Sequence, residues 1–319
     1  MMNKVEEYIK QLRLLGRTQE EAEWIVNNIG IPTEAEFCLP LEELINAFEE
    51  AEKAAYNFGA IASGIDLRDY RIKPDTINNT SFELYDLPPV KNQRYVNSCV
   101  AHSSSSILEW LNSKETNEYH ELSVGFIYGM QGVAFNKMGS GMRLRDVCKI
   151  VQRYGNCLHA TIPFNLEMPI CYKRLIEKLN DSIYHEASTY QIKSYARCMT
   201  KNAVKYALIK YGPVLLSARW YKDYSLNDDY VINFDTASEK GCHAIMVYGF
   251  NEKGWLCQNS WGSEWGNNGR FILPYTNGFR EAWSFVDAQN DDIYKPYRNT
   301  LFDMIYKAIN YIINLFIND

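Results

Sequence analysis

The sequence lacks any run of 18 or more uncharged apolar residues, so it predicts no membrane-spanning helix. Its first ten residues, MMNKVEEYIK, lack the basic-then-apolar pattern of a secretory signal. It also lacks a basic excess, because its formal net charge is −6. A nucleic-acid-binding surface is therefore not expected, since such surfaces are strongly positive. We predict a chain that has no nucleic-acid partner and is not secreted through a classical signal peptide.

Paired cysteines are missing as well. The eight cysteines contain no CxxC motif, and the nearest Cys/His neighbours are Cys157 with His159 and Cys242 with His243. Neither pair has the spacing of a zinc site, so we predict no metal and no other cofactor. In a chain of this length without a secretion signal, cysteines are expected to remain thiols.

Charge and hydrophobic periodicity divide the chain of 319 residues into three parts. Residues 1–60 hold 12 acidic and 5 basic residues, whereas the remainder is almost neutral at +1. Apolar residues at helical spacing predict helices there that need another surface for packing. We predict an N-terminal helical segment over 1–60, a main domain over 61–290 and an amphipathic helix within 291–319.

The main domain is predicted to be α+β. Residues 61–98 are rich in proline and asparagine and read as extended chain. Apolar periodicity then predicts helices starting at Cys99 and covering 142–154 and 201–210. Strand patterns follow in the second half, at 214–218, 244–250, 255–258 and 271–273. A helical first half is thus followed by an antiparallel, β-rich second half.

The last 19 residues, LFDMIYKAINYIINLFIND, form a separate pattern. Asp303, Lys307, Asn310 and Asn314 fall on one stripe of a helix whose other faces are apolar. We expect this helix to pack on its own protein or on a subunit. Contact with a membrane surface is the less favoured alternative, because the polar stripe carries little Lys or Arg.

Cys99 stands out among the cysteines because it begins a predicted helix. Free backbone N–H groups and the helix dipole favour an anion at that position, which lowers the pKa of a thiol. Gln93, six residues earlier, carries an amide that could join the Cys99 N–H in binding an oxyanion. A buried, inert thiol is the default interpretation of a lone cysteine.

A thiolate nucleophile needs a base, and His243 is the best candidate among five histidines. It opens a predicted strand, and the next strand ends next to Asn259, which could hydrogen-bond the ring and fix its tautomer. His102 follows Cys99 by three residues on the same helix, so we interpret it as structural. Each feature alone is weak evidence for a catalytic site. Together they are stronger evidence, because the order and the spacings of 6, 144 and 16 residues from Gln93 to Asn259 would rarely arise by chance.

These residues occur within stretches that resemble papain and the cathepsins. The similarity runs from Asp66 to about residue 287, and its best pieces are PPVKNQRYVNSCVAHSSS, RDVCKIVQRYG and GCHAIMVYGFNEKGWLCQNSWGSEWGNNGRFILPY. The resemblance implies a two-lobed fold with a cleft between a helical and a β-rich lobe. It implies that Cys99 is the nucleophile, His243 the base and acid, Asn259 the residue that orients His243, and Gln93 an oxyanion donor. It also implies that Trp261 shields the His–Asn pair.

The sequence departs from the family pattern in two places. Val96 replaces the cysteine that usually precedes the nucleophile by three residues, so the usual disulfide is absent. The segment that binds substrate backbone in the family reads Gly139-Ser140-Gly141-Met142 here. By resemblance we assign Gly141, Met142, Cys242 and Trp261 to substrate binding. These traits resemble the signal-less microbial and giant-virus branch, which implies a cytoplasmic or virion-associated protein.

The resemblance therefore predicts a cysteine endopeptidase that acts on protein or peptide substrates. An exopeptidase, amidase or peptide ligase on the same fold is one alternative, and a non-catalytic binding module is another. We hypothesise that residues 1–60 act as a pro-segment that restricts access to Cys99 in a zymogen. A stability module or a partner-binding module is the alternative for that segment.

Overall fold

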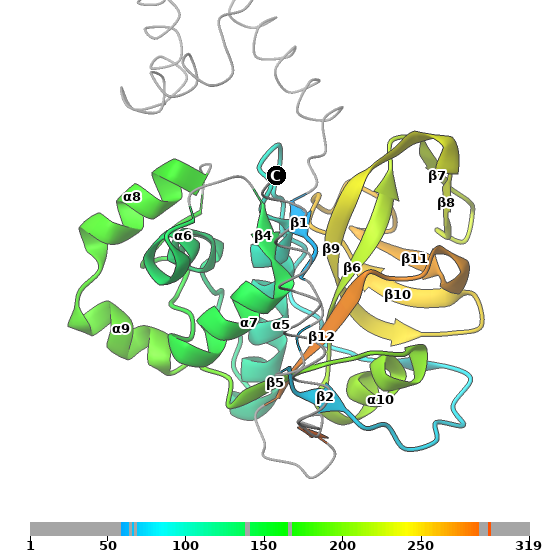
Figure 1. The fold of residues 1–319 in the computed structure, drawn as a ribbon, viewed down its shortest axis with the longest axis horizontal. Helices are drawn as coiled ribbons and strands as arrows, with labels where there is room; N and C mark the ends of the chain where they lie inside the picture. Colours follow the sequence, from blue (N-terminus) through cyan, green and yellow to red (C-terminus); the bar gives the residue numbers. More distant parts are fainter. Residues whose placement is uncertain are drawn as a thin grey trace, which may run out of the picture. The chain divides into compact units, whose positions relative to one another are not determined.

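The computed structural model describes residues 59–63, 66, 69–137, 141–164, 168–286 and 293–294 (Figure 1). Residues from Asn57 onward form one compact unit, and Met1–Tyr56 form another that lies outside the described residues, as does the helix predicted over 301–319. The segment predicted over 291–319 is described only at two residues, which form a strand and not a helix. Ile293–Tyr294 form strand β13, which pairs with β2, because two residues of high β propensity extend a sheet edge there.

The helical half begins at the residue that the sequence pattern indicated. Its helices are α5 (Cys99–Thr116), α6 (Val124–Phe135), α7 (Leu144–Arg153), α8 (Met168–Lys178) and α9 (Asp181–Ser188). Side chains cap two of them: Ser123 accepts the N–H of Phe126, and Asn180 accepts that of Ile183. Helix α5 is buried over its first eleven residues and packs against the sheet, so it lies in the core of the unit that starts at Asn57.

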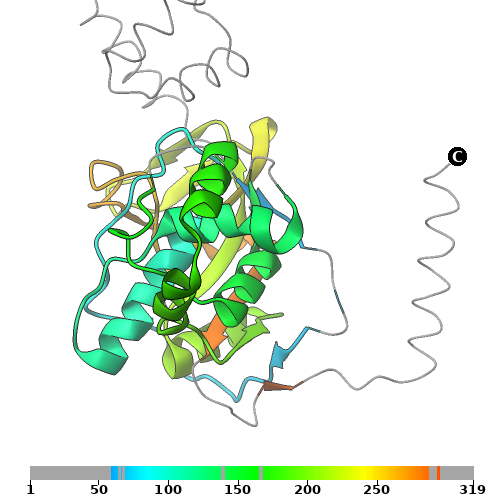
Figure 2. The same ribbon diagram turned by 90° about the vertical axis from the view of Figure 1, so that its left-hand side faces the viewer.

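The second half is built on a nine-stranded sheet with the order β11-β10-β9-β6-β12-β5-β2-β13, in which β3 also pairs with β9. The strands are β2 (Arg71–Ile72), β3 (Phe82–Glu83), β5 (Ser194–Arg197), β6 (Val214–Tyr221), β9 (Glu239–Phe250), β10 (Gly254–Gln258), β11 (Arg270–Pro274), β12 (Glu281–Val286) and β13. Helix α10 (Lys201–Tyr211) precedes β6, and a small ribbon joins β7 (Tyr224–Leu226) to β8 (Ile232–Phe234). Figure 2 views the helical half in front of this sheet.

The two halves meet where α5 packs against β9 and β6. A short parallel ribbon of β1 (Ala60–Ile61) and β4 (Met142–Arg143) lies between the helices and the sheet (Figure 1). The predicted α+β architecture, with a helical and a β-rich lobe, is therefore confirmed. The same junction brings the first residues of α5 and the middle of β9 together, although they are about 140 residues apart in sequence.

Candidate active site

Cys99 is the first residue of α5, and its side chain is fully buried. Its Sγ accepts two backbone N–H groups from other elements. Ala244 of β9 donates over 3.5 Å, and Gly59 donates over 3.3 Å. The sulfur therefore lies at the point where the helical lobe, the sheet and the β1 segment meet.

His243 directly precedes Ala244 on β9, so its backbone adjoins the N–H group that donates to the Cys99 sulfur. Strand β10 pairs antiparallel with β9 and ends at Gln258, so Asn259 returns alongside the histidine. The ring Nε2 and the Asn259 Oδ1 are 2.7 Å apart. Because Oδ1 can only accept, Nε2 carries the proton, and the other nitrogen, Nδ1, is the one that would exchange a proton with a thiol.

Two indoles surround the imidazole of His243. The Trp261 ring stacks on it with centroids 4.6 Å apart and an angle of 27° between the planes. The Trp220 ring stands across it at 4.9 Å and 73°. Both the histidine and Asn259 are buried, so the hydrogen bond between them is shielded from water. The sequence predicted the shield from Trp261 but not the contact with Trp220.

Gln93 is buried and held by the loop that also carries Asn259. Its backbone N–H donates to the Ser260 carbonyl, and its Oε1 accepts the Ser260 hydroxyl over 2.6 Å. Its Nε2 donates to the Val96 carbonyl over 2.7 Å, just before α5 begins. The carboxamide is therefore fixed beside the N-terminus of the helix that starts with Cys99.

Burial controls the proton affinities of the pair. It raises the pKa of the Cys99 thiol to about 11, although the N–H groups of Ala244 and Gly59 act in the opposite direction. Burial lowers the pKa of His243 to about 4 against the effect of the Asn259 hydrogen bond. The sequence-based expectation of a lowered thiol pKa considered only the helix N-terminus. In the folded protein, desolvation changes the pKa of the thiol more than the helix N-terminus does. It favours the neutral forms of the thiol and of the imidazole.

Residues Gly59–Ser63, which we call the strap, cover this site. Its β1 residues pair in parallel with β4, the Gly59 carbonyl accepts the Met142 N–H over 2.7 Å, and the Gly59 N–H meets the Cys99 sulfur. A Cβ built on Gly59 would lie 2.0 Å from the Asn97 carbonyl oxygen, so only glycine fits there. The sequence division placed residues 59 and 60 in the N-terminal segment, yet both pack within the main unit.

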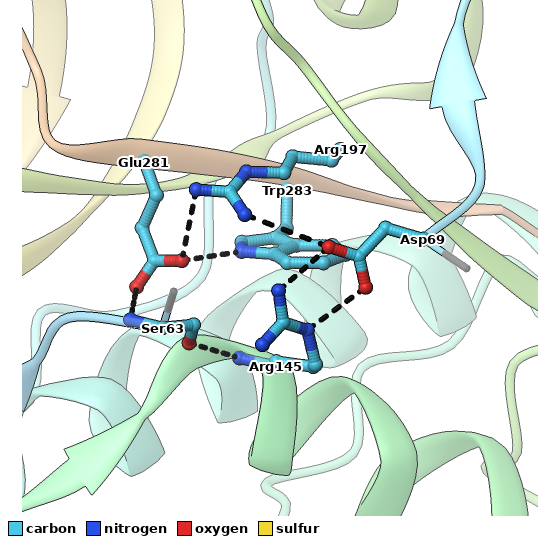
Figure 3. A network of polar contacts seen from close by, with 6 residues as sticks. All are labelled: Ser63, Asp69, Arg145, Arg197, Glu281 and Trp283. Carbon is cyan, nitrogen blue, oxygen red and sulfur yellow. Dashed lines mark hydrogen bonds and ion pairs between the residues drawn. The ribbon is translucent and has the colours of Figure 1, made fainter. Parts of the chain in front are cut away.

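A buried polar network fastens the end of the strap to both lobes (Figure 3). The Ser63 N–H donates to Glu281 Oε1 over 3.1 Å, and the Ser63 Oγ accepts the Arg145 N–H over 3.3 Å. Asp69 binds the Arg145 guanidinium through two hydrogen bonds of 2.8 and 2.6 Å, and Arg197 lies 3.5 Å from the same carboxylate. Removing one partner of a buried ion pair costs about 3–5 kcal/mol, so Asp69 is firmly held, while Ser63 is bound by its two hydrogen bonds.

Trp283 of β12 forms the surface on which this network lies (Figure 3). The guanidinium carbons of Arg145 and Arg197 are 5.6 and 5.5 Å from its ring centroid. Its Nε1 donates to the second oxygen of Glu281 over 3.1 Å, and burial raises the pKa of that carboxyl. Both oxygens of Glu281 therefore have donors, one of which belongs to the strap.

The residues assigned to substrate binding lie in three different settings. Gly141 (φ +85°) and Met142 both face the strap, because a Cβ on Gly141 would lie 2.8 Å from the Gly59 oxygen and Met142 donates to that oxygen. Trp261 stacks on His243. Cys242 is half-buried, and as the neighbour of His243 on β9 its side chain points to the other face of the strand. The roles of these four residues stay predictions.

The seven cysteines of the described ranges are free thiols. No group of three metal-ligating side chains occurs in that part of the chain. The helices among the same residues include none that is long and apolar enough to cross a membrane.

The chain belongs to the papain family of cysteine proteases, because the model of that family matches residues 74–279. This family assignment makes it a cysteine-type peptidase, as the sequence motifs predicted. The match includes Gln93, Cys99, His243 and Asn259.

Individual comparisons agree with the family. An uncharacterized peptidase C1-like protein of Acanthamoeba polyphaga mimivirus is 26% identical and covers 69% of this chain and 81% of its own length. Mouse cathepsin K is 27% identical over 58% of this chain, which spans 55% of that relative's length. Among solved structures, the cysteine protease xylellain of Xylella fastidiosa matches with a TM-score of 0.64 at 22% identity, covering 73% of this chain and 96% of its own. At this level of identity, the similarity to xylellain shows a shared fold.

Proposed function

We propose that the chain is an endopeptidase in which Cys99, His243 and Asn259 form a catalytic triad and Gln93 supplies an oxyanion donor. The observation that carries the proposal is the His243–Asn259 hydrogen bond beside a sulfur at a helix N-terminus. In this mechanism the Cys99 thiolate attacks the peptide carbonyl, and the Cys99 N–H and the Gln93 amide bind the oxyanion. His243 then protonates the leaving amine, and a water molecule that His243 deprotonates hydrolyses the thioester.

The strap supports endopeptidase action rather than removal of terminal residues. It is an internal stretch of polypeptide, and it passes the sulfur in extended form while pairing with β4. A site that holds an internal segment of polypeptide in this way can accept an internal segment of a substrate chain. The test is hydrolysis of a peptide library whose members have blocked or free ends. Cleavage of doubly blocked peptides is expected, and cleavage restricted to peptides with one free end would replace the proposal by an exopeptidase.

The strap also supports a self-inhibited, zymogen-like state. Cys99 is fully buried next to the strap, which presents no scissile carbonyl at Gly59, because the Gly59 carbonyl bonds to Met142 while its N–H meets the sulfur. Access of substrate to Cys99 then requires that the strap leave β4. The network of Asp69 and Glu281 opposes this departure by holding the chain that follows.

Replacing Gly59 with alanine is expected to open the site in the full-length chain. The added methyl would meet the Asn97 carbonyl, and overpacking of this kind costs about 1–3 kcal/mol. That cost corresponds to an increase of about 5- to 150-fold in the fraction of chains with an open site. The measurement is the rate at which an uncharged thiol reagent labels Cys99, together with kcat/KM on one peptide.

The matched control for that experiment is Ala62→Val, which adds bulk to an exposed position of the same strap. It should leave both rates close to those of the unmodified chain. Equal labelling rates in the Gly59→Ala and unmodified chains, with both folded, would show that the strap does not restrict access.

Gln93→Ala should lower kcat by about 10²- to 10³-fold, which is the usual effect of removing one oxyanion donor, while KM changes little. Gln258→Ala is the control, because Gln258 is a buried glutamine of β10 whose amide donates to Pro88 and not toward α5. If kcat were unchanged in Gln93→Ala, the amide would not serve the reaction.

A further inference from the structure

The pairing of β6 with β9 places a second aromatic residue on the same face as His243. Ala218 lies directly opposite His243, and Trp220 follows two residues later, so both point to the face that carries the imidazole. A diagonal neighbour of this kind is within reach of a large ring. Because the residue directly opposite is an alanine, its methyl group leaves space for the indole of Trp220 to lean toward the histidine.

An irregularity in the strand pairing occurs at the same place. The register of β6 on β9 shifts between Trp220 and Tyr221, where Trp220 pairs with Gly241 and Tyr221 with Glu239. Such bulges bend a strand and redirect the side chains next to them. Gly241, opposite Trp220, has no side chain that would compete for the space.

The three rings form a compact triangle. The Trp220 centroid is 4.9 Å from that of His243 and 5.1 Å from that of Trp261, and its plane is turned by 73° and 82° from theirs. His243 and Trp261 are stacked 4.6 Å apart. Trp220 is therefore nearly perpendicular to both members of the stack and equally close to each, so it lies across their edges and blocks sideways movement of the imidazole.

Other aromatic rings hold Trp220 in this position. The rings of Phe234, Tyr224 and Phe271 meet it at 5.1, 5.7 and 5.6 Å, each at an angle above 70°. Trp220 is fully buried, and its ring contacts include these side chains, His243 and Trp261. Its effect on the reaction must therefore pass through His243.

We propose that Trp220 is a positioning residue that fixes the orientation of the His243 imidazole from the side that Asn259 and Trp261 leave open. Asn259 holds one ring nitrogen, Trp261 covers one face and Trp220 closes the edge. The proposal rests on the catalytic role of His243 given above. It adds a residue that neither the motifs nor the assigned triad includes.

Loss of this contact has a recognisable effect on the pH dependence. The nearest nucleophilic group on α5 is the Cys99 thiol, which accepts the N–H of Ala244, the residue after His243, and the Tyr224 ring contacts both indoles. A thiolate and an imidazolium stabilise each other only while the ring points at the sulfur. A freely turning imidazole weakens this mutual stabilisation. Thiolate formation then moves to higher pH and loss of the imidazolium to lower pH, so the bell of kcat/KM against pH narrows from both sides.

The experiment compares Trp220→Leu, Trp220→Phe and the control Trp255→Leu. Trp255 is an equally buried indole of the same sheet, and its ring neighbours are Phe250 and Tyr275. All chains are full length and carry Gly59→Ala, so that any contribution of the strap is the same in each. The measurements are kcat, KM, the pH profile of kcat/KM and the melting temperature. If Trp220→Leu is not recovered folded, Trp220→Met takes its place, because methionine fills irregular space.

We expect the leucine variant to lose about tenfold in kcat with little change in KM, and its bell to narrow by about one pH unit in total. The phenylalanine variant should recover most of the lost kcat and most of the lost width of the bell. Trp255→Leu should melt earlier but keep the width of the bell. An unchanged width in Trp220→Leu, or an equal narrowing in Trp255→Leu, would overturn the proposal. His243→Ala is measured in parallel: if that change leaves kcat intact, the triad itself fails rather than the role of Trp220.

Discussion

Replacing Cys99 with alanine is expected to lower kcat by about four to six orders of magnitude, as removal of a nucleophile does in other proteases with covalent catalysis. The fold should persist, because the change deletes one sulfur atom from a buried position on a long helix. Two backbone donors, Ala244 and Gly59, lose their sulfur acceptor, so the variant should be destabilised by about 1–3 kcal/mol and still fold. Peptide hydrolysis and thermal unfolding, measured on the same preparation, test both halves of this expectation.

Cys198→Ala is the matched control, because Cys198 is also a buried thiol whose pKa is raised by burial. That variant should retain full activity. Substantial turnover by Cys99→Ala would refute the assignment of the nucleophile. The rival interpretation, a binding module on a peptidase fold, has its own signature: a folded chain in which a vinyl sulfone reagent fails to label Cys99 even when Gly59→Ala is present.

The elements that carry the candidate triad could be predicted because their signals are local. Helix α5 begins at Cys99 as its apolar periodicity indicated, and β9 and β10 are separated by a short turn that places Asn259 near His243. In such a hairpin the loop and the alternation of side chains determine which residues meet. The proximity of positions 16 residues apart could therefore be predicted, whereas the exact register of the strands, which shifts between Leu256 and Cys257, could not.

Helix α6 was not predicted as a helix of defined length because it has no polar face. All of its residues up to Gly132 are buried, so the sequence lacks the polar stripe on which a helix prediction depends. Its glycines also lower its helix propensity, yet two of them are required by packing. A Cβ on Gly125 would lie 2.9 Å from the Pro163 carbonyl oxygen, and one on Gly132 would lie 1.9 Å from the Tyr172 ring.

The strap could not be predicted because its contacts are made almost entirely by backbone atoms. Residues 59–63 read Gly-Ala-Ile-Ala-Ser, and no charged side chain among them indicates a partner. The bond from Ser63 to Glu281 joins positions 218 residues apart, and the parallel pairing with β4 depends on how two lobes meet. The same reason applies to Trp220, whose approach to His243 depends on the register of β6 on β9 and on the bulge that follows it.

His243→Ala is expected to be almost as damaging as Cys99→Ala, whereas Asn259→Ala should be milder by about two orders of magnitude. His243 carries the proton in both steps, while Asn259 only holds Nε2 through the 2.7 Å bond. The measurement is kcat/KM from pH 4 to pH 10, with His159→Ala as the control, because the half-exposed His159 lies near the carboxylate of Glu121.

The shape of the two pH profiles separates these roles further. Without His243 no imidazolium supports the thiolate, so the residual rate should keep rising through alkaline pH as the unassisted thiol ionises. With Asn259→Ala the imidazole is still present, so the profile should remain bell-shaped at reduced height. A bell-shaped pH profile for His243→Ala would contradict the roles assigned to the two residues. A larger loss of kcat/KM in Asn259→Ala than in His243→Ala would contradict them as well. The reason is that a residue that only orients the ring cannot matter more than the ring that transfers the proton.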